Sequence, residues 1–136
     1  MAVDVVSLLR DHGVQPSAQR VAVGEYVLST DAHPSADEVW AKVGKRLLIS
    51  RATVYNALNL LAEKGLIRAL TLAGGRVVFD PKLDRHHHFI DEETGAIHDV
   101  PWEAVRVSDV EALAPRGYDV REYQVVMRGR RRSRRR

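Results

Sequence analysis

The first 80 residues are predicted to form helices with clear ends and then two short strands, an order that few folds share. Apolar spacing predicts helices over residues 3–12 and 17–29. A Ser-x-x-Glu capping box at Ser35 opens a third helix through the following turns. Ser50 is the expected cap of a fourth helix, which ends before Gly65.

The fourth helix, over residues 51–64, has an unusual outer face. Its apolar side consists of Val54, Ala57, Leu58 and Leu61. Its opposite side carries small, amide and phenolic groups: Ala52, Tyr55, Asn56 and Asn59. Alternating residues then predict strands over 66–72 and 75–80. Helices followed by a hairpin are typical of a winged helix-turn-helix, whose last helix enters the DNA major groove.

A second, smaller unit is expected over residues 83–128. Strands are predicted over 86–91, 96–100 and 118–127, with a second Ser-x-x-Glu capping box at Ser108 opening a short helix. The expected class is therefore α+β: a winged-helix domain over residues 1–82 and a small α/β domain after it. A unit this small buries too little surface to form a good core alone, which predicts a homodimer.

The charge of the chain is concentrated at its end. The formal net charge is +3 and the sequence pI is about 9.5, but seven arginines lie in the last nine residues. We expect residues 129–136 to be a disordered arginine-rich tail. Such a tail either serves solubility or attracts nucleic acid without sequence preference.

Composition excludes several classes of protein. No run approaches the roughly 18 apolar residues that a membrane span requires, and the first residues lack the pattern of a signal peptide. The chain has no cysteine, so disulfides, thiolate metal sites and thiol catalysis are excluded. We expect a cytoplasmic protein with no membrane partner.

Histidine and aspartate residues form the pattern with the most chemistry. His86 and His88 are two residues apart on a predicted strand, so their imidazoles leave the same face. Asp80 precedes them, Asp99 lies on the partner strand, and His33 belongs to the DNA-binding half. Imidazoles with carboxylates and no thiolate suit Fe(II), Mn(II), Zn(II) or Ni(II). A merely polar strand is the alternative, and spacing alone does not place His33 beside the others.

Several short motifs occur in a fixed order along the chain: Gly13-Val14, Gln19-Arg20, Ala32-His33-Pro34-Ser35-Ala36-Asp37, Ser50-Arg51-Ala52-Thr53-Val54-Tyr55-Asn56-Ala57-Leu58, Glu63-Lys64-Gly65-Leu66, Phe79-Asp80 and His86-His87-His88. In these motifs the sequence resembles the ferric uptake regulator family, and the resemblance extends from about residue 8 to residue 128. Asn56 after Tyr55, and aspartate at both carboxylate positions, resemble the peroxide-sensing branch, with the iron-response branch second.

The resemblance implies a homodimeric repressor that binds a double-stranded DNA operator and has one regulatory metal site in each subunit. Its implied ligands are His33, Asp80, His86, His88 and Asp99. Fe(II) or Mn(II) is the implied metal, and Zn(II) could occupy the site in purified protein. By the same resemblance, peroxide would oxidise His33 or His86 of the iron form and release DNA. No catalytic residues and no small-molecule substrate are expected.

The resemblance also implies the residues that read DNA. Tyr55 is expected to contact thymine methyl groups or phosphate, and Asn56 a base edge or phosphate. Arg51 is expected to contact the backbone at the helix start. Arg20 either supports that contact or forms a surface ion pair.

Two departures from the family pattern stand out. Where most members carry Cys-x-x-Cys pairs for a structural zinc, this chain has Asp91 and Thr94, then Arg131 and Arg134. We therefore expect no structural cysteine–zinc site. A further regulatory site of some relatives would need ligands at Arg85, Arg106 and Tyr123, and we expect it to be absent.

Other functions remain open at this stage. An iron-response regulator could sense haem through residues 86–88, and a zinc, manganese or nickel sensor could use the same ligands. A non-haem iron oxygenase would explain the ligands but not the N-terminal half. A non-specific nucleic-acid-binding protein would depend on the arginine tail alone.

Overall fold

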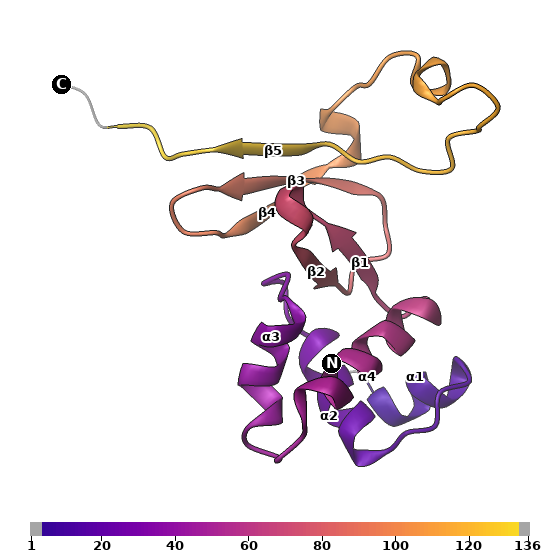
Figure 1. Ribbon diagram of the computed structural model, residues 1–136, viewed down its shortest axis with the longest axis vertical. Coiled ribbons are helices and arrows are strands. Elements are labelled where there is room, and N and C mark those ends of the chain that lie inside the picture. The colour runs from indigo at the N-terminus through magenta and orange to yellow at the C-terminus, as the bar shows by residue number, and fades with distance from the viewer. Residues whose placement is uncertain (1–3, 134–136) are drawn as a thin grey trace. The chain divides into compact units, whose positions relative to one another are not determined.

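The structure, a computed structural model, describes residues 4–133 and divides into two compact units with the boundary after Leu83 (Figure 1). The first unit contains the helices α1 to α4 and a two-stranded sheet, and the second contains a three-stranded sheet. This mixture of helices and sheets confirms the expected α+β class. Among the described residues, no helix is long and apolar enough to cross a lipid bilayer.

Helices of the first unit begin where the sequence supplies side-chain caps. Their bounds are α1 Val5–Asp11, α2 Ala18–Val27, α3 Ala36–Val39 and α4 Arg51–Glu63. The chain continues from α3 into a single π-turn, Trp40–Gly44. Both halves of the predicted capping box form, since Ser35 accepts from the Glu38 amide and Glu38 accepts from the Ser35 amide. The predicted helices are thus confirmed, the first two being somewhat shorter than expected.

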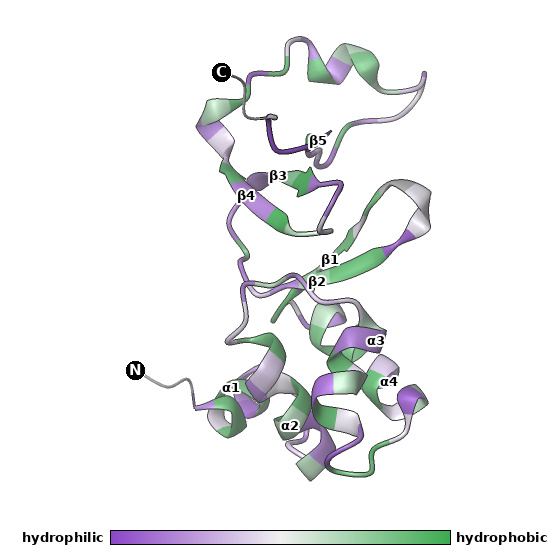
Figure 2. Ribbon diagram, turned by 90° about the vertical axis from the view of Figure 1, so that its left-hand side faces the viewer, coloured by the Kyte–Doolittle hydropathy of each residue, from purple (hydrophilic) through white to green (hydrophobic). Residues whose placement is uncertain are grey.

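The core of the first unit lies where the apolar faces of these helices meet. On α4 the predicted apolar stripe is buried: Val54, Ala57, Leu58 and Leu61. In Figure 2 the helices are banded in green and purple, as expected for elements with one buried and one solvated face. Because the apolar side of α4 packs inward, its amide and phenolic side is left facing solvent.

A hairpin follows the helices and forms the wing. Strand β1, Arg68–Thr71, pairs antiparallel with β2, Val77–Asp80. The turn between them relies on glycine, because Gly74 and Gly75 have φ angles of +85° and +82°. Both predicted strands are confirmed, although each is shorter than its alternating pattern suggested.

The second unit is a sheet with strand order β4-β3-β5. Strand β3, His86–Asp91, lies in the centre, antiparallel to β4, Ile97–Pro101, and parallel to β5, Val126–Gly129. Gly129, where the arginine tail was expected to begin, is the last residue of β5. Residues 134–136 of the tail lie outside the described part of the chain.

Two expectations for this unit are wrong. The capping box at Ser108 does not form: Asp109 precedes a short 3₁₀ turn, Val110–Leu113, with a φ angle of +54° and no side-chain cap. The predicted strand over residues 118–127 begins only at Val126. In the parallel register His88 lies opposite Val126, so β3 starts too late to offer hydrogen-bonding partners to the residues before Gln124.

Side chains organise the β3–β4 turn, which contains Asp91 and Thr94. The Asp91 carboxylate accepts hydrogen bonds from the amides of Glu93 (2.9 Å) and Thr94 (3.4 Å). The Thr94 hydroxyl accepts from the amide of Ala96 at 3.1 Å. The turn is therefore closed by an Asx-type hydrogen-bond network.

We predict that the sheet domain does not depend on metal for folding. With a strong chelator present, the protein should keep its far-ultraviolet circular dichroism and a cooperative thermal transition, because hydrogen bonds close the β3–β4 turn. A domain built on a zinc knuckle would unfold under the same treatment. Loss of the cooperative transition on chelation would contradict this account.

We predict a specific acid sensitivity from Asp91. Its hydrogen bonds from the Glu93 and Thr94 amides lower the pKa of Asp91 below 3.8. The carboxylate therefore stabilises the fold above about pH 4 and loses this contribution as pH falls through the lowered pKa. Compared with Asp91→Asn in urea denaturation, the wild-type protein should be more stable at neutral pH. This advantage should shrink in acid, and an advantage that does not change with pH would contradict the prediction.

Candidate metal centre and nucleic-acid interface

One pair of ligand-type side chains lies in the first unit. His33 precedes α3 with a φ angle of +53°, a backbone conformation that is rare outside glycine. Its Nε2 lies 3.1 Å from Oδ2 of Asp80, and both residues are buried. The Phe79 amide donates to the Pro34 carbonyl at 2.9 Å, so neighbouring residues join the two segments. The other Asp80 oxygen accepts from the Lys82 amide at 2.9 Å.

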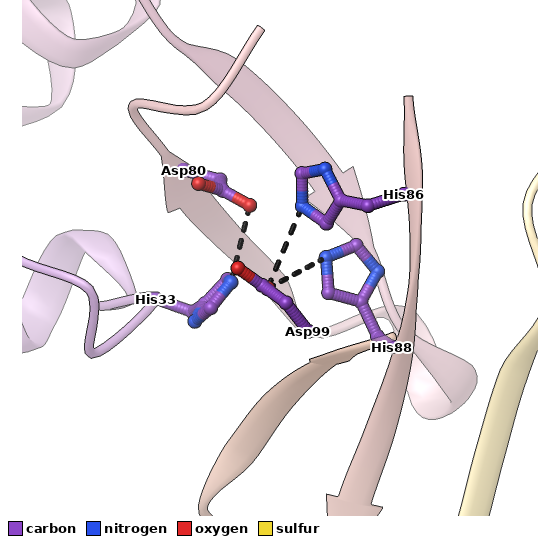
Figure 3. Close-up of side chains that lie close together, drawn as sticks. All are labelled: His33, Asp80, His86, His88 and Asp99. Carbon is purple, nitrogen blue, oxygen red and sulfur yellow. Dashed lines mark ion pairs between the residues drawn. The ribbon is translucent and has the colours of Figure 1, made fainter. Parts of the chain in front are cut away.

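Three further ligand-type side chains converge in the second unit (Figure 3). His86 and His88 leave the same face of β3, and Asp99 lies opposite His88 on β4. The Nε2 atoms of the two histidines lie 3.5 and 3.8 Å from Oδ1 of Asp99. The predicted spacing of these residues therefore places one ligand atom from each within 4.8 Å of the others.

Hydrogen bonds at the opposite ring nitrogens orient both β3 imidazoles. Nδ1 of His86 lies 2.8 Å from the Asp84 carbonyl oxygen, and Nδ1 of His88 lies 3.1 Å from Oε1 of Gln124. Since these oxygens only accept, each Nδ1 must carry the proton. In the neutral rings, Nε2 then presents its lone pair toward Asp99. Metal-binding histidines in proteins are held by the same arrangement.

The donor set of the second unit fits a divalent cation. Two imidazole lone pairs and one carboxylate oxygen converge at separations longer than ordinary N–H···O hydrogen bonds. Lone pairs that face a carboxylate repel it unless a proton or a cation lies between them. Nitrogen and oxygen donors without sulfur suit Fe(II), Mn(II) or Zn(II). The His33–Asp80 pair of the first unit offers donors of the same two kinds.

His87 serves a different purpose on the opposite face of β3. Its ring is buried and stacks on Trp102, with centroids 4.6 Å apart and planes 14° apart. Its Nδ1 accepts a hydrogen bond from the Val125 amide at 2.9 Å. Burial and the neighbouring His88 lower the pKa of His87, which favours the neutral ring. The His87 side chain thus connects the segment before β5 to strand β3.

The outward face of α4 carries two of the predicted DNA-reading residues. Arg51 and Tyr55 lie one turn apart on α4, and both are exposed. Both contact the carboxylate of Asp37 on α3, Arg51 through its guanidinium and Tyr55 through its hydroxyl. Asp37 raises the pKa of Arg51, which stays charged at any physiological pH.

The other two predicted DNA-reading residues lie on a neighbouring surface. Asn56 and Arg20 line the same hollow of about 390 Å³ at the start of α2. The Arg20 guanidinium donates to the Gln15 carbonyl at 3.1 Å, which holds the loop before α2. Arg20 thus supports the backbone at the edge of this hollow and forms no carboxylate ion pair among the described contacts.

Sequence reasoning gives no functional role to three residues that the structure connects to these sites. The pattern places Asp37 only inside the capping box, yet it contacts both Arg51 and Tyr55. Trp40 has no predicted role, and the Arg51 guanidinium lies over its ring. Gln124 orients His88 from 36 residues away. The i, i+3 spacing of Asp37 and Trp40 is a usable signal, whereas nothing in the local sequence points to Gln124.

Comparison with known proteins agrees with this architecture. The sequence model of the ferric uptake regulator family matches residues 11–128. The peroxide operon regulator of Bacillus subtilis is 34% identical over 129 residues, covering 93% of this chain and 88% of that protein. The peroxide-responsive repressor PerR of Staphylococcus epidermidis is 32% identical, covering 91% and 83%.

Solved structures share the fold at lower identity. The ferric uptake regulator of Vibrio cholerae superposes with a TM-score of 0.73 at 24% identity, covering 93% of this chain and 99% of that chain. The peroxide stress regulator of Campylobacter jejuni gives a TM-score of 0.63 at 24% identity, covering 96% and 98%.

A helical unit that ends in a two-stranded wing, followed by a small sheet unit with clustered histidine and aspartate side chains, is the architecture of a winged-helix domain joined to a second domain. The matching sequence family and relatives are transcriptional regulators. The chain belongs to the ferric uptake regulator family. This is a family of transcriptional regulators. The resemblance first read from the Ala-Thr-Val-Tyr-Asn and His-x-His motifs is thereby confirmed.

Proposed function

We propose that this protein is a homodimeric, cytoplasmic repressor that binds operator DNA in its metal-loaded form and releases it in response to peroxide. The observation that carries the proposal is the oriented ligand set of His86, His88 and Asp99. Relatives named as peroxide-responsive, at 31–34% identity over most of the chain, favour this signal over haem or another metal.

We infer that one metal ion joins the two ligand groups. His33 and Asp80 would supply two donors from the winged-helix unit, and His86, His88 and Asp99 three from the sheet unit. An ion held by both units would bind one arrangement of them more tightly than any other. Its differential affinity would then appear as coupling to DNA binding, typically about 1–3 kcal/mol.

Bound Fe(II) would promote cleavage of hydrogen peroxide so that one oxygen atom adds to a neighbouring imidazole and the other leaves as water, chemistry that Mn(II) would not supply. The residues of this chain convert that chemistry into a change in DNA binding. His33 and His86 would place oxidisable imidazoles beside the metal, and an oxygen added to either ring would remove a ligand. With fewer donors, the units would lose their preferred arrangement and the protein would leave DNA.

We further infer that the sheet unit pairs with a second copy of itself. An open, largely apolar groove of about 630 Å³ lies along residues 107–125. Leu113 and Tyr118 in its lining are 71% and 72% exposed, and β5 forms the edge of its sheet. Exposed apolar side chains and an open strand edge of this kind favour association.

The direct test uses duplex DNA selected from a random library by the Mn(II)-loaded protein. The metal-free protein should bind the selected duplex weakly, and Mn(II) or anaerobic Fe(II) should both tighten binding. Hydrogen peroxide should then release only the iron form, with peptide masses showing one added oxygen at His33 or His86. An iron form that keeps its DNA without oxidised histidine would contradict peroxide sensing at this site.

A second prediction concerns the residue that orients His88. Gln124→Ala removes the acceptor for the His88 Nδ1 proton, so Mn(II) affinity should fall by about 10-fold, the lower end of typical outer-shell effects. Gln19→Ala, at an exposed position of α2, is the matched control and should leave affinity unchanged. Isothermal titration with Mn(II) measures both variants, and equal affinity in all three proteins would contradict the assignment.

A further inference from the structure

The Asp37 carboxylate on α3 forms an ion pair with the guanidinium of Arg51. Arg51 is the first residue of α4, the proposed recognition helix. Arg51 Nη2 lies 2.5 Å from Oδ1 of Asp37, and both side chains are more than half exposed. The same guanidinium lies 5.7 Å above the ring centroid of Trp40. Asp37 and Trp40 are three residues apart, so they share one face of the helix. Arg51 is therefore held by an ion pair from α3 and by a cation–π contact from the π-turn that continues it.

The same carboxylate oxygen also fixes the next residue of that surface. The Tyr55 hydroxyl donates to Oδ1 of Asp37 at 3.1 Å. Arg51 and Tyr55 are four residues apart and therefore neighbours on the outer face of α4. One aspartate thus sets the positions of two side chains that face solvent on the DNA-reading helix.

Glu38, the neighbour of Asp37, makes a similar ion pair with an arginine of the wing. Glu38 accepts from the Arg76 guanidinium at 3.2 Å, and Arg76 directly precedes strand β2. Adjacent carboxylates at the start of α3 therefore hold one arginine from the recognition helix and one from the wing. Because carboxylates repel DNA phosphates, two of them on this surface work against simple electrostatic affinity.

We propose that Asp37 is a positioning residue that determines DNA specificity, holding Arg51 and Tyr55 in place and weakening binding to non-specific DNA. This inference rests on the proposed DNA-binding function and adds how the protein would discriminate its operator from non-specific DNA.

Non-specific binding depends on cations that are free to neutralise phosphates. Arg51 must break its ion pair with Asp37 before its guanidinium can contact a phosphate of non-specific DNA. At the operator, the fixed positions of Arg51 and Tyr55 reduce the rotamer freedom lost on binding. Asp37 thus disfavours non-specific DNA while leaving operator binding largely intact, which raises the ratio of the two affinities.

The experiment measures the salt dependence of binding to a random-sequence duplex for the Mn(II)-loaded, full-length protein. Asp37→Asn keeps the size and an acceptor oxygen but removes the charge. This variant should bind the random duplex about two- to fivefold more tightly per DNA-binding unit, as expected for release of an exposed ion pair. The slope of log affinity against log salt should steepen by about 0.9 for each additional phosphate contact.

The matched control is Glu63→Gln, which removes one negative charge at the other end of α4. Glu63 is exposed and twelve residues beyond Arg51, or about 18 Å along the helix. It should leave the salt slope unchanged. In an Arg51→Ala background, Asp37→Asn should lose its effect, because the released guanidinium is missing. Thermal melting verifies that each variant is folded.

The proposal is overturned if Asp37→Asn leaves the slope and the non-specific affinity at their wild-type values. It is also overturned if Glu63→Gln gives the same change, or if the effect persists without Arg51. Failure of the proposed function would look different, since library selection would then enrich no sequence. The random-duplex slopes would still test Asp37 in that case.

Discussion

The hydrogen bond from the Phe79 amide to the Pro34 carbonyl, 2.9 Å long, joins the two segments on which the winged-helix unit depends. One segment continues from His33 into the first turn of α3, where Asp37 and Glu38 hold the arginines of the recognition helix and the wing. The other is strand β2, which ends at Asp80 and follows Arg76. Ligand-type residues and residues of the proposed DNA-binding surface therefore lie four or five positions apart along these segments. Under the proposed function, a change at His33 or Asp80 would have only a short, hydrogen-bonded path to that surface.

The sheet unit forms without cysteine, which the chain lacks altogether. Asp91 and Thr94 close the β3–β4 turn with hydrogen bonds to three backbone amides. On one face of β3, His86 and His88 turn their Nε2 atoms toward Asp99. On the other, His87 stacks on Trp102 and holds the Val125 amide. Alternation along a single strand thus separates the face that carries the candidate ligands from a packing face.

Local sequence was sufficient wherever local rules decide structure. Side-chain caps located the starts of α3 and α4, alternating residues located the two strands of the wing, and the two-residue spacing of His86 and His88 placed them on one face. Prediction failed where long-range pairing decides. Residues 118–123 alternate like a strand, yet β3 offers them no partner in register. The contacts of Asp37 with Arg51 and of Gln124 with His88 join residues 14 and 36 positions apart, which spacing rules do not reach.

The proposed regulation requires that metal affinity and operator affinity be coupled. The most direct test is Mn(II) titration of the protein with and without a saturating amount of its selected operator duplex. Linkage requires that DNA tighten Mn(II) binding by the same factor by which Mn(II) tightens DNA binding, about 5- to 150-fold for typical coupling energies. Asp99→Asn should weaken Mn(II) binding in both titrations. An Mn(II) affinity that is identical with and without the operator would contradict the account.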